Sequence, residues 1–447
     1  MRAEEIDSQR QAPGPRGWPF VGVGPAYRVD PLSFLTRMQQ QFGDIVTLPM
    51  GSRRRLFLLS DPAYVEQLLV AHASNYHSRD INRSAMEFLG DGLLNIDGET
   101  HRHDRALVQP SFSRRQVESY AAIMLDHTDT MLHRWKPNTE VSFRHEMQRL
   151  TLGIAAQAFF GLDLRHESAA FGDAFSRIIR YRPLTVIGVP RPKWDLPITA
   201  YGQMQRARAF LDEQIYARIT QRRQQAIPGD IISSLVQAGM RDEQVRDHAM
   251  TFLAAGHETT ANALAFAFYL FSTHASASTP LLQELAAELG NRDVVLDDLP
   301  RLPALDRFTR ESLRLYPPAW IIGRRAVADD AIGNFRLPAR SFAIASQWVM
   351  HRMPRYWPDP LAFRPDRWLP HEQGGQNIIP YTYFPFGGGP RTCIGMPFAQ
   401  QELRLILARI LQHYVPELVP GQRLVLEPHI TLRPLRGTRM RLVPRLR

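Results

Sequence analysis

The chain has one cysteine, Cys393, in 447 residues, and the setting of this residue limits what the chain can be. Cys393 lies in a glycine-dense loop, residues 386–395, which leads into an amphipathic helical pattern that begins near Met396. A lone cysteine excludes an internal disulfide and a zinc site built from several thiolates. Glycines let backbone N–H groups approach the sulfur, and the positive end of the following helix should lower the pKa of the thiol. The loop therefore favours an anionic sulfur that can act as a ligand.

The hydrophobic periodicity predicts a mainly α fold with a minor β region. Apolar residues at three- and four-residue spacing are typical of amphipathic helices. Alternating apolar residues at 45–48 and 56–59, around a turn at 50–52, predict a hairpin, and a further alternating region, 424–442, predicts strands. The predicted helices span 63–72, 117–135, 201–225, 243–273, 281–289 and 396–414.

No linker rich in glycine, serine or charge divides the chain, so we expect one folded domain at 16–447 after a flexible tail at 1–15. Residues 1–11 are polar and charged, unlike a signal peptide or a membrane anchor. The longest nearly apolar stretch, 259–271, is shorter than the roughly 20 residues that cross a bilayer. We therefore expect a cytoplasmic protein without a membrane anchor.

The charge balance suits an acidic partner. Lys and Arg number 54 and Asp and Glu 44, which gives a net charge of +10, and the positive charge is almost entirely arginine. The arginines are scattered, and no zinc-finger or aromatic-basic pattern accompanies them, so nucleic-acid binding is disfavoured.

A polar motif, 255–260, lies inside the most apolar predicted helix, where an acid and a hydroxyl are costly to bury without a task. The Thr259 hydroxyl can bond back to the carbonyl of Ala255, one turn earlier. Gly256 has no side chain to fill the groove, so we expect the helix to open locally and admit a small molecule.

Five residues of the cysteine loop carry a resemblance to a known family: Phe386, Gly389, Arg391, Cys393 and Gly395 match the F-x-x-G-x-R-x-C-x-G loop of the cytochrome P-450 superfamily. The resemblance implies the cytochrome P-450 fold in a soluble, bacterial-type enzyme. It also implies that Cys393 is the axial ligand of the iron of heme b, that Phe386 packs beside the sulfur, and that Arg391 pairs with a haem propionate.

The same resemblance assigns further residues. Glu258 and Thr259 resemble the oxygen-activation motif, in which the threonine stabilises iron-bound oxygen and the acid relays protons. Glu311 and Arg314 match the E-x-x-R element, with Arg367 as the third member of a structural trio. The expected propionate donors are His101, Arg105, Arg324 and His351, although His101 stands where the family most often has tryptophan and Arg325 could replace Arg324.

The implied activity is that of a haem-thiolate monooxygenase that uses dioxygen to oxidise a small, largely apolar organic molecule. No flavin, nicotinamide or iron–sulfur motif occurs in the chain, so we expect electrons from a separate ferredoxin or flavodoxin that docks near Arg102, Arg114 and Arg115. We also expect a monomer. The pocket candidates are Phe88, Leu89, Leu93, Val186, Trp320, Ile321 and Ile430.

Three alternatives stay open at this point. An oxidative coupling enzyme or a peroxide-driven hydroxylase would share the fold, although an intact Glu258–Thr259 pair argues against the peroxide reaction. A haem-based sensor belongs to a different class and would need a signalling module. A hydrolase with Cys393 as its nucleophile would need a nearby histidine base.

Overall fold

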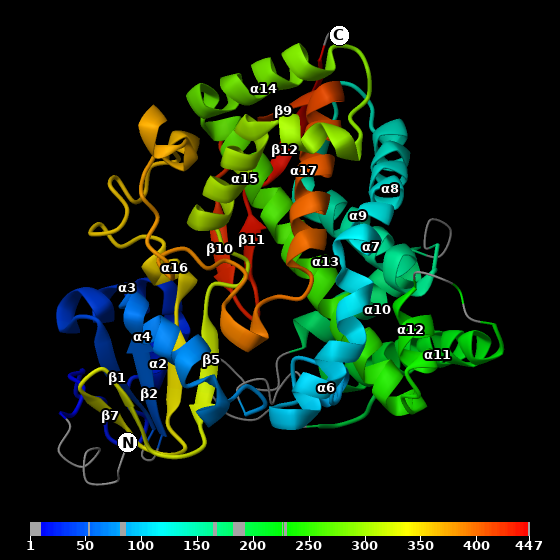
Figure 1. Cartoon of the computed structure of the whole chain (residues 1–447). Helices are drawn as coiled ribbons and strands as arrows, with labels where there is room; N and C mark the ends of the chain where they lie inside the picture. Colours follow the sequence, from blue (N-terminus) through cyan, green and yellow to red (C-terminus); the bar gives the residue numbers. More distant parts are fainter. Residues whose placement is uncertain are drawn as a thin grey trace.

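The computed structural model describes residues 10–51, 54–80, 86–163, 168–181, 193–225, 227 and 230–445. Figure 1 shows a large helical part and, at the lower left, a smaller part built around a β-sheet. The cysteine loop and the start of α17 (Met396–His413) lie near the centre of this view. The predicted fold class, mainly α with a minor β region, is confirmed.

The sheet in the smaller part begins with the predicted hairpin. Strand β1 (Ile45–Met50) pairs antiparallel with β2 (Arg54–Leu59), with Ile45 opposite Leu59. The chain then returns much later: β8 (Phe342–Ala345) runs parallel to β2, and β5 (Ile322–Ala326) lies antiparallel beside β8. The two-residue strand β3 (Tyr76–His77) closes the order β1-β2-β8-β5-β3.

Part of the predicted N-terminal tail is attached to this region. The Arg10 amide donates to the carbonyl of Asn334 at 3.1 Å, and the Thr47 amide donates to the carbonyl of Pro13 at 2.7 Å. These backbone bonds attach the chain to the sheet region from Arg10 onward, residues 1–9 lie outside the described ranges, and the flexible tail at 1–15 stays a prediction. The assignment of 16–447 to a single domain stays a prediction.

The helical part is organised around α13 (Asp242–Thr273), whose side chains are mostly buried. It packs against α9 (Phe143–Phe160), α11 (Ala200–Gln224) and α17. Gly256 of α13 faces α9, and a Cβ added there would lie 3.0 Å from the Phe159 ring. Because α13 is continuous through Gly256, the expected local opening of the helix is not seen, and the glycine serves close helix packing instead.

Two predicted helices are interrupted in the structure. The segment 117–135 divides into α7 (Arg114–Ser119) and α8 (Ala121–Arg134), and the segment 63–72 divides into α4 (Pro62–Glu66) and a π-helical turn, Gln67–Ala71. Apolar periodicity continues across both breaks, which is why the sequence did not reveal them. The other helices are α2 (Gly24–Val29), α3 (Pro31–Phe42), α5 (Met86–Leu89), α6 (Gly98–Val108), α10 (Ser168–Arg180), α12 (Ile231–Gln237), α14 (Ala275–Leu289), α15 (Pro303–Leu315) and α16 (Gln347–Met350).

The C-terminal strands join two different sheets. Strand β10 (Val425–Pro428) forms a hairpin with β11 (Leu432–Arg436). Strand β12 (Arg439–Pro444) instead lies between β4 (Glu140–Ser142) and β9 (Tyr414–Leu418). The alternation across 424–442 correctly predicted strands, but it could not reveal that β11 and β12 belong to different sheets. The remaining strands, β6 (Asp330–Ile332) and β7 (Phe335–Leu337), form a small hairpin.

Over the ranges that the structure describes, no helix has both the length and the apolar character that a membrane span requires.

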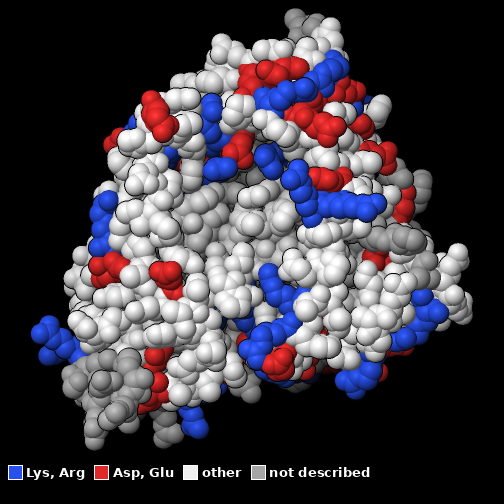
Figure 2. Space-filling view, viewed as in Figure 1, with Lys and Arg blue, Asp and Glu red and all other residues white. Residues whose placement is uncertain are grey.

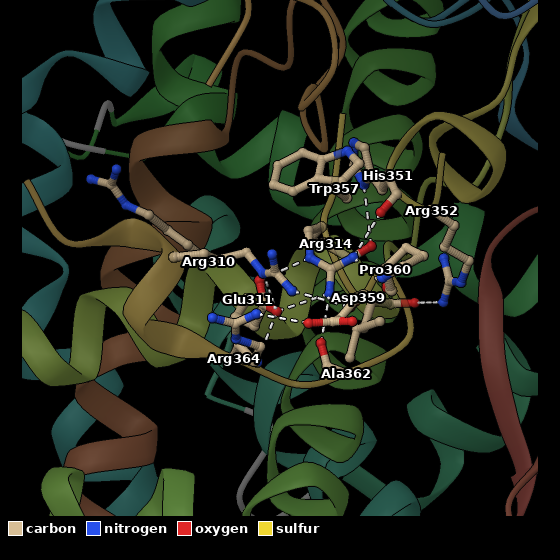
Figure 3. Close-up of polar contacts among 12 residues, drawn as sticks. Arg310, Glu311, Arg314, His351, Arg352, Trp357, Asp359, Pro360, Ala362 and Arg364 are labelled. Atoms are coloured by element: carbon tan, nitrogen blue, oxygen red, sulfur yellow. Dashed lines mark hydrogen bonds and ion pairs between the residues drawn. The ribbon is translucent and has the colours of Figure 1, made fainter. Parts of the chain in front are cut away.

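A fully buried carboxylate, Glu311, ties α15 to a segment that is more than fifty residues away in sequence (Figure 3). Arg314 donates to both of its oxygens, at 2.9 and 2.8 Å. Arg367 donates to Oε1 at 2.9 Å and the Trp368 indole to Oε2 at 3.0 Å. The backbone amide of Arg364 adds a further bond at 2.9 Å. The predicted trio of Glu311, Arg314 and Arg367 therefore forms.

Arg314 extends this network by donating to backbone carbonyls. Its guanidinium bonds to the carbonyls of His351 (2.7 Å), Pro360 (2.8 Å) and Ala362 (3.0 Å). The same group lies over the Trp357 ring, 5.2 Å from its centroid. Arg314 thus fixes the long irregular segment that precedes the cysteine loop, and Figure 3 shows these carbonyls converging on it.

Replacing Glu311 by alanine should lower the free energy of unfolding by about 3–5 kcal/mol, because two buried arginines would lose their counter-charge. Denaturant-induced unfolding measures this loss. The matched control is Glu140→Ala, which breaks an exposed ion pair with Arg439 (2.8 Å) and should cost about 1 kcal/mol or less. Equal losses in the two variants would contradict the anchoring role.

Candidate functional site

The cysteine loop has a backbone that few other sequences could adopt. The Cys393 amide donates to the carbonyl of Phe386 at 2.9 Å, which closes the loop. Gly389 has a φ of +66°, and a Cβ added there would lie 1.9 Å from the carbonyl oxygen of Leu69 in the π-helical turn. Only glycine combines this conformation with so close an approach.

The Cys393 side chain is accessible, although protein surrounds it. Burial raises the pKa of the thiol, while the Gly395 amide and the Arg105 charge act in the opposite direction. The expectation of a lowered pKa is therefore wrong for the thiol on its own, because burial outweighs the helix terminus. A sulfur that is accessible yet desolvated faces a hollow inside the protein, and a bound metal would deprotonate it.

Three arginines and a histidine gather near this sulfur. Burial, and then the charge of Arg391, lower the pKa of Arg324 to about 10. Burial also lowers the pKa of His101 to about 4, and the charges of Arg391 and Arg105 add to the effect. Each of these side chains is therefore close enough to another for their charges to interact. The structure brings His101, Arg105, Arg324 and Arg391 together, as the sequence predicted.

Asp97, which the sequence analysis missed, contributes one negative charge to this cluster. It pairs with Arg391 and accepts bonds from the backbone amides of Ser78 and Arg79. Within the residues that the structure describes, three arginines against one carboxylate leave two positive charges, which matches the two carboxylates of a haem. An accessible thiol and two uncompensated cations are the donor set that an iron porphyrin needs, so the residues fit this cofactor.

His351 does not belong to the cluster. Its Nε2 accepts the Phe384 amide at 3.1 Å, and its Nδ1 lies 3.3 Å from the carbonyl of Arg314. Burial holds the pKa of this histidine well below its usual value. Both ring nitrogens are engaged by the backbone, so the expected propionate contact is not supported, and His351 links the Arg314 network to the chain before the cysteine loop.

Thr259 and Glu258 point to different sides of α13. The Thr259 hydroxyl donates to the carbonyl of Ala255 at 2.6 Å, as expected, and both residues are accessible although the helix around them is buried. Glu258 is buried and faces the C-terminal hairpin, where Arg433 lies 3.4 Å away. Ala255 and Thr259 are therefore accessible positions on a helix that is otherwise mostly buried.

The pocket candidates divide by exposure. Phe88, Leu89 and Leu93 are buried, as is Trp320, whose indole donates to the carbonyl of His429 at 3.0 Å. Ile430, at the tip of the β10–β11 hairpin, is exposed. Ile321 is partly exposed, and Val186 lies outside the described residues.

The surface around the cysteine loop carries basic residues. In Figure 2, Lys and Arg side chains lie above and below a hollow near the centre of the face. Arg102 and Arg114 have side-chain exposures of 67% and 93%, and Arg115 is also exposed. Arg102 pairs with Glu99 and Arg114 with Glu118, so part of this charge is already neutralised.

Comparisons with known proteins give one consistent result. A family model described as "Cytochrome P450" matches residues 12–437. The chain is 33% identical over 439 residues to cyclooctatin synthase of Streptomyces melanosporofaciens, covering 95% of this chain and 94% of that protein. It is 31% identical over 448 residues to cyclooctat-9-en-7-ol 5-monooxygenase of the same organism, covering 95% of each.

The structure resembles retinoic acid bound cyanobacterial CYP120A1, with a TM-score of 0.86, 28% identity, and coverage of 98% of this chain and 100% of that one. It also resembles the cytochrome P450DA haem domain, with a TM-score of 0.86, 24% identity and 98% coverage of each chain, which supports the fold alone. The fold and the relatives define a haem-thiolate monooxygenase. The chain belongs to the cytochrome P450 family, since both the family model and the relatives cover nearly all of it.

His257, beside the acid of α13, should make stability depend on pH. Burial lowers the pKa of His257 to about 3. In the unfolded chain His257 therefore binds a proton near pH 6.5, whereas in the folded chain it stays neutral down to about pH 3. The free energy of unfolding falls as the pH drops from about 6.5 toward 3. This residue alone should cost about 2 kcal/mol between pH 8 and pH 5.

Denaturant unfolding at the two pH values tests this expectation. His257→Gln should reduce the difference by about 2 kcal/mol, whereas the exposed control His371→Gln should leave it unchanged. If the His257 variant keeps the wild-type difference, the histidine is not held neutral in the fold.

Proposed function

We propose that Cys393 binds the iron of heme b as a thiolate, and that the enzyme inserts oxygen from dioxygen into a largely apolar organic substrate. The observation that carries this proposal is the accessible, desolvated Cys393 thiol beside a cluster with two uncompensated positive charges. A thiolate-bound haem supplies the electron density that promotes cleavage of the O–O bond.

The arginine cluster binds and orients the cofactor. Arg105, Arg324 and Arg391 would donate to the two propionates, and His101 would add a further donor from its ring. Asp97 holds Arg391 in place before the cofactor arrives. Phe386 closes the loop through its carbonyl, which accepts the Cys393 amide, and its ring would pack beside the sulfur.

Two residues of α13 handle protons. The Thr259 hydroxyl, fixed by the carbonyl of Ala255, presents its oxygen to the hollow and orients a proton donor there. Glu258 carries protons from the opposite side of the helix. Intact Glu258 and Thr259 support a reaction that consumes protons with dioxygen, which distinguishes it from a peroxide-driven one.

The substrate is an apolar carbon skeleton. Ala254, Ala255 and Thr259 are accessible positions on an otherwise buried helix, and the first two are apolar. One relative is named as a monooxygenase of cyclooctat-9-en-7-ol, and one similar solved structure has retinoic acid bound. Both molecules are largely hydrocarbon. We propose a substrate of this kind, which the pocket holds by shape and apolar contact.

Electrons reach the haem from an acidic ferredoxin or flavodoxin, and the enzyme works as a cytoplasmic monomer. Support for the donor comes from the exposed Arg102, Arg114 and Arg115 on α6 and α7, and from the net charge of +10. Complementary charge speeds such encounters and makes them sensitive to salt.

Cys393→Ser should abolish the long-wavelength absorbance band of the reduced, carbon-monoxide-bound enzyme, because a serine oxygen cannot replace the thiolate. The matched variant is Arg324→Gln, which should weaken haem retention yet keep the band, since it leaves the sulfur in place. Survival of the band in Cys393→Ser would contradict the ligand assignment.

Arg102→Glu combined with Arg114→Glu should slow reduction of the haem by the donor about tenfold or more at low salt, because two attractive charges become repulsive. Stopped-flow reduction measures the rate. Raised salt should shrink the difference. The control, Arg28→Glu on α2, reverses the charge of an exposed arginine in the sheet region and should leave the rate unchanged. If this control slows reduction as much as the double variant does, α6 and α7 are not part of the docking surface.

A further inference from the structure

Helix α6 carries one buried acid, Asp104, that is not part of the arginine cluster. His101, Asp104 and Val108 are the buried residues of this helix, and their spacing of three and four positions places them on one face. Asp104 is 4% exposed. His101 and Arg105 lie in the cluster near Cys393, whereas the carboxylate between them in sequence bonds to the central helix α13.

The partner of Asp104 on α13 is His248, which is fully buried. Nε2 of His248 lies 3.0 Å from Oδ2 of Asp104. Burial acts to raise the pKa of Asp104, but the bonds from His248 and His103 outweigh it and lower the pKa, so the group is a carboxylate near pH 7. Because a carboxylate only accepts hydrogen bonds, Nε2 of His248 is the donor.

Within the described residues this is the one side-chain hydrogen bond that joins α6 to α13, and it is the one polar contact of His248. The Nδ1 atom of His248 is buried and forms no hydrogen bond there. The ring stacks on Phe252, one turn further along α13, with the centroids 6.1 Å apart. A ring with an unbonded polar atom is costly to bury, so the bond to Asp104 is what a histidine contributes at this position.

The chain directly after α6 is packed against the same part of α13. Phe112, in the turn Gln109–Phe112, lies 5.7 Å from the Phe252 ring. An apolar contact is not directional, so Phe112 alone leaves α6 free to rotate about its axis. The directional bond between Asp104 and His248 sets that rotation, and with it the direction in which Arg105 points.

The arginine cluster acts on α6 in the opposite sense. Burial lowers the pKa of Arg391, Asp97 opposes this effect, and the charge of Arg105 adds to it. Arg105 on α6 and Arg391 in the cysteine loop are thus like charges in a desolvated site, where repulsion is stronger than in water. This repulsion favours displacement of α6 until two negative charges are bound between them.

We propose that Asp104 is a positioning residue whose bond to His248 holds α6 against this repulsion, so that His101 and Arg105 are in place to bind the haem propionates. The inference rests on the proposed function, in which these two side chains hold the cofactor. In this role Asp104 contacts neither cofactor nor substrate. It keeps the donors ordered beforehand, which reduces what ordering them costs when the cofactor binds.

The test measures the release of haem from the complete ferric enzyme to an excess of apomyoglobin. Asp104→Leu should speed release about tenfold or more, because α6 loses a hydrogen bond to a charged group. His248→Phe keeps a ring stacked on Phe252 but has no N–H, so it should speed release to a similar extent, and it gives the same test if Asp104→Leu does not fold. Asp104→Asn keeps an acceptor for His248 and should stay close to the wild-type rate.

The double variant Asp104→Leu/His248→Phe shows whether the two residues act through one bond. It should release haem no faster than the single variants do, because the second substitution removes a bond that is already lost. Resonance Raman spectra provide a second readout. The propionate bending bands should shift in both single variants and keep their wild-type frequencies in Asp104→Asn.

A matched control separates positioning from stability. Asp298 is 1% exposed and pairs with Arg292 and Arg301, which are not in the arginine cluster. Asp298→Leu should lower the melting temperature, as Asp104→Leu does, because each leaves buried polar groups without their partner. It should leave haem release and the propionate bands unchanged.

A merely structural Asp104 would lower the melting temperature in Asp104→Leu but leave haem release and the propionate bands at their wild-type values, and that outcome overturns the inference. Additive effects of Asp104→Leu and His248→Phe on release would overturn it too. The carbon-monoxide band separates the two levels. If wild type lacks the band, the proposed function fails. If wild type shows it and the Asp104 and His248 variants release haem at the wild-type rate, only the role of Asp104 fails.

Discussion

The carboxylate of Glu311 is the interaction on which the arrangement of this fold most depends. The carboxylate is fully buried and accepts hydrogen bonds from Arg314, Arg367 and Trp368. If α15 and the segment around 359–368 moved apart, charges would be left unpaired in the core. That segment and His351 lead into the cysteine loop. The position of the sulfur is therefore set by a charge network with no part in the chemistry, because such a network has one low-energy arrangement.

Local patterns in the sequence predicted the site well where neighbours in sequence make the contacts. The cysteine loop, the Thr259 bond to Ala255 and the β1–β2 hairpin are all short-range features. Apolar periodicity likewise located α13 and α17, because long helices bury one continuous stripe. The grouping of His101, Arg105, Arg324 and Arg391 needed the family resemblance, since these residues span almost three hundred positions and no spacing rule connects them.

The sequence failed where a tertiary contact decided the role of a residue. His351 was expected at the cofactor, yet backbone groups occupy both of its ring nitrogens. Gly256 was expected to loosen α13, yet it lets Phe159 approach. Asp97 and Arg433 gave no signal, because an isolated acid or arginine in a chain with many of each is indistinguishable from a solvated one. Each miss concerns a partner that is distant in sequence.

The contact between Gly389 and the carbonyl of Leu69 has an implication for how this loop can change over time. The π-helical turn offers a bare oxygen at the spot where a methyl group would have to sit, so position 389 is restricted by steric exclusion alone. A lineage could lose catalysis, exchange its substrate or alter its electron donor and still be unable to vary this residue. The glycine is thus required by the backbone packing, whereas the cysteine four positions later is required by the chemistry. The cysteine could therefore change in a protein that still needs the glycine.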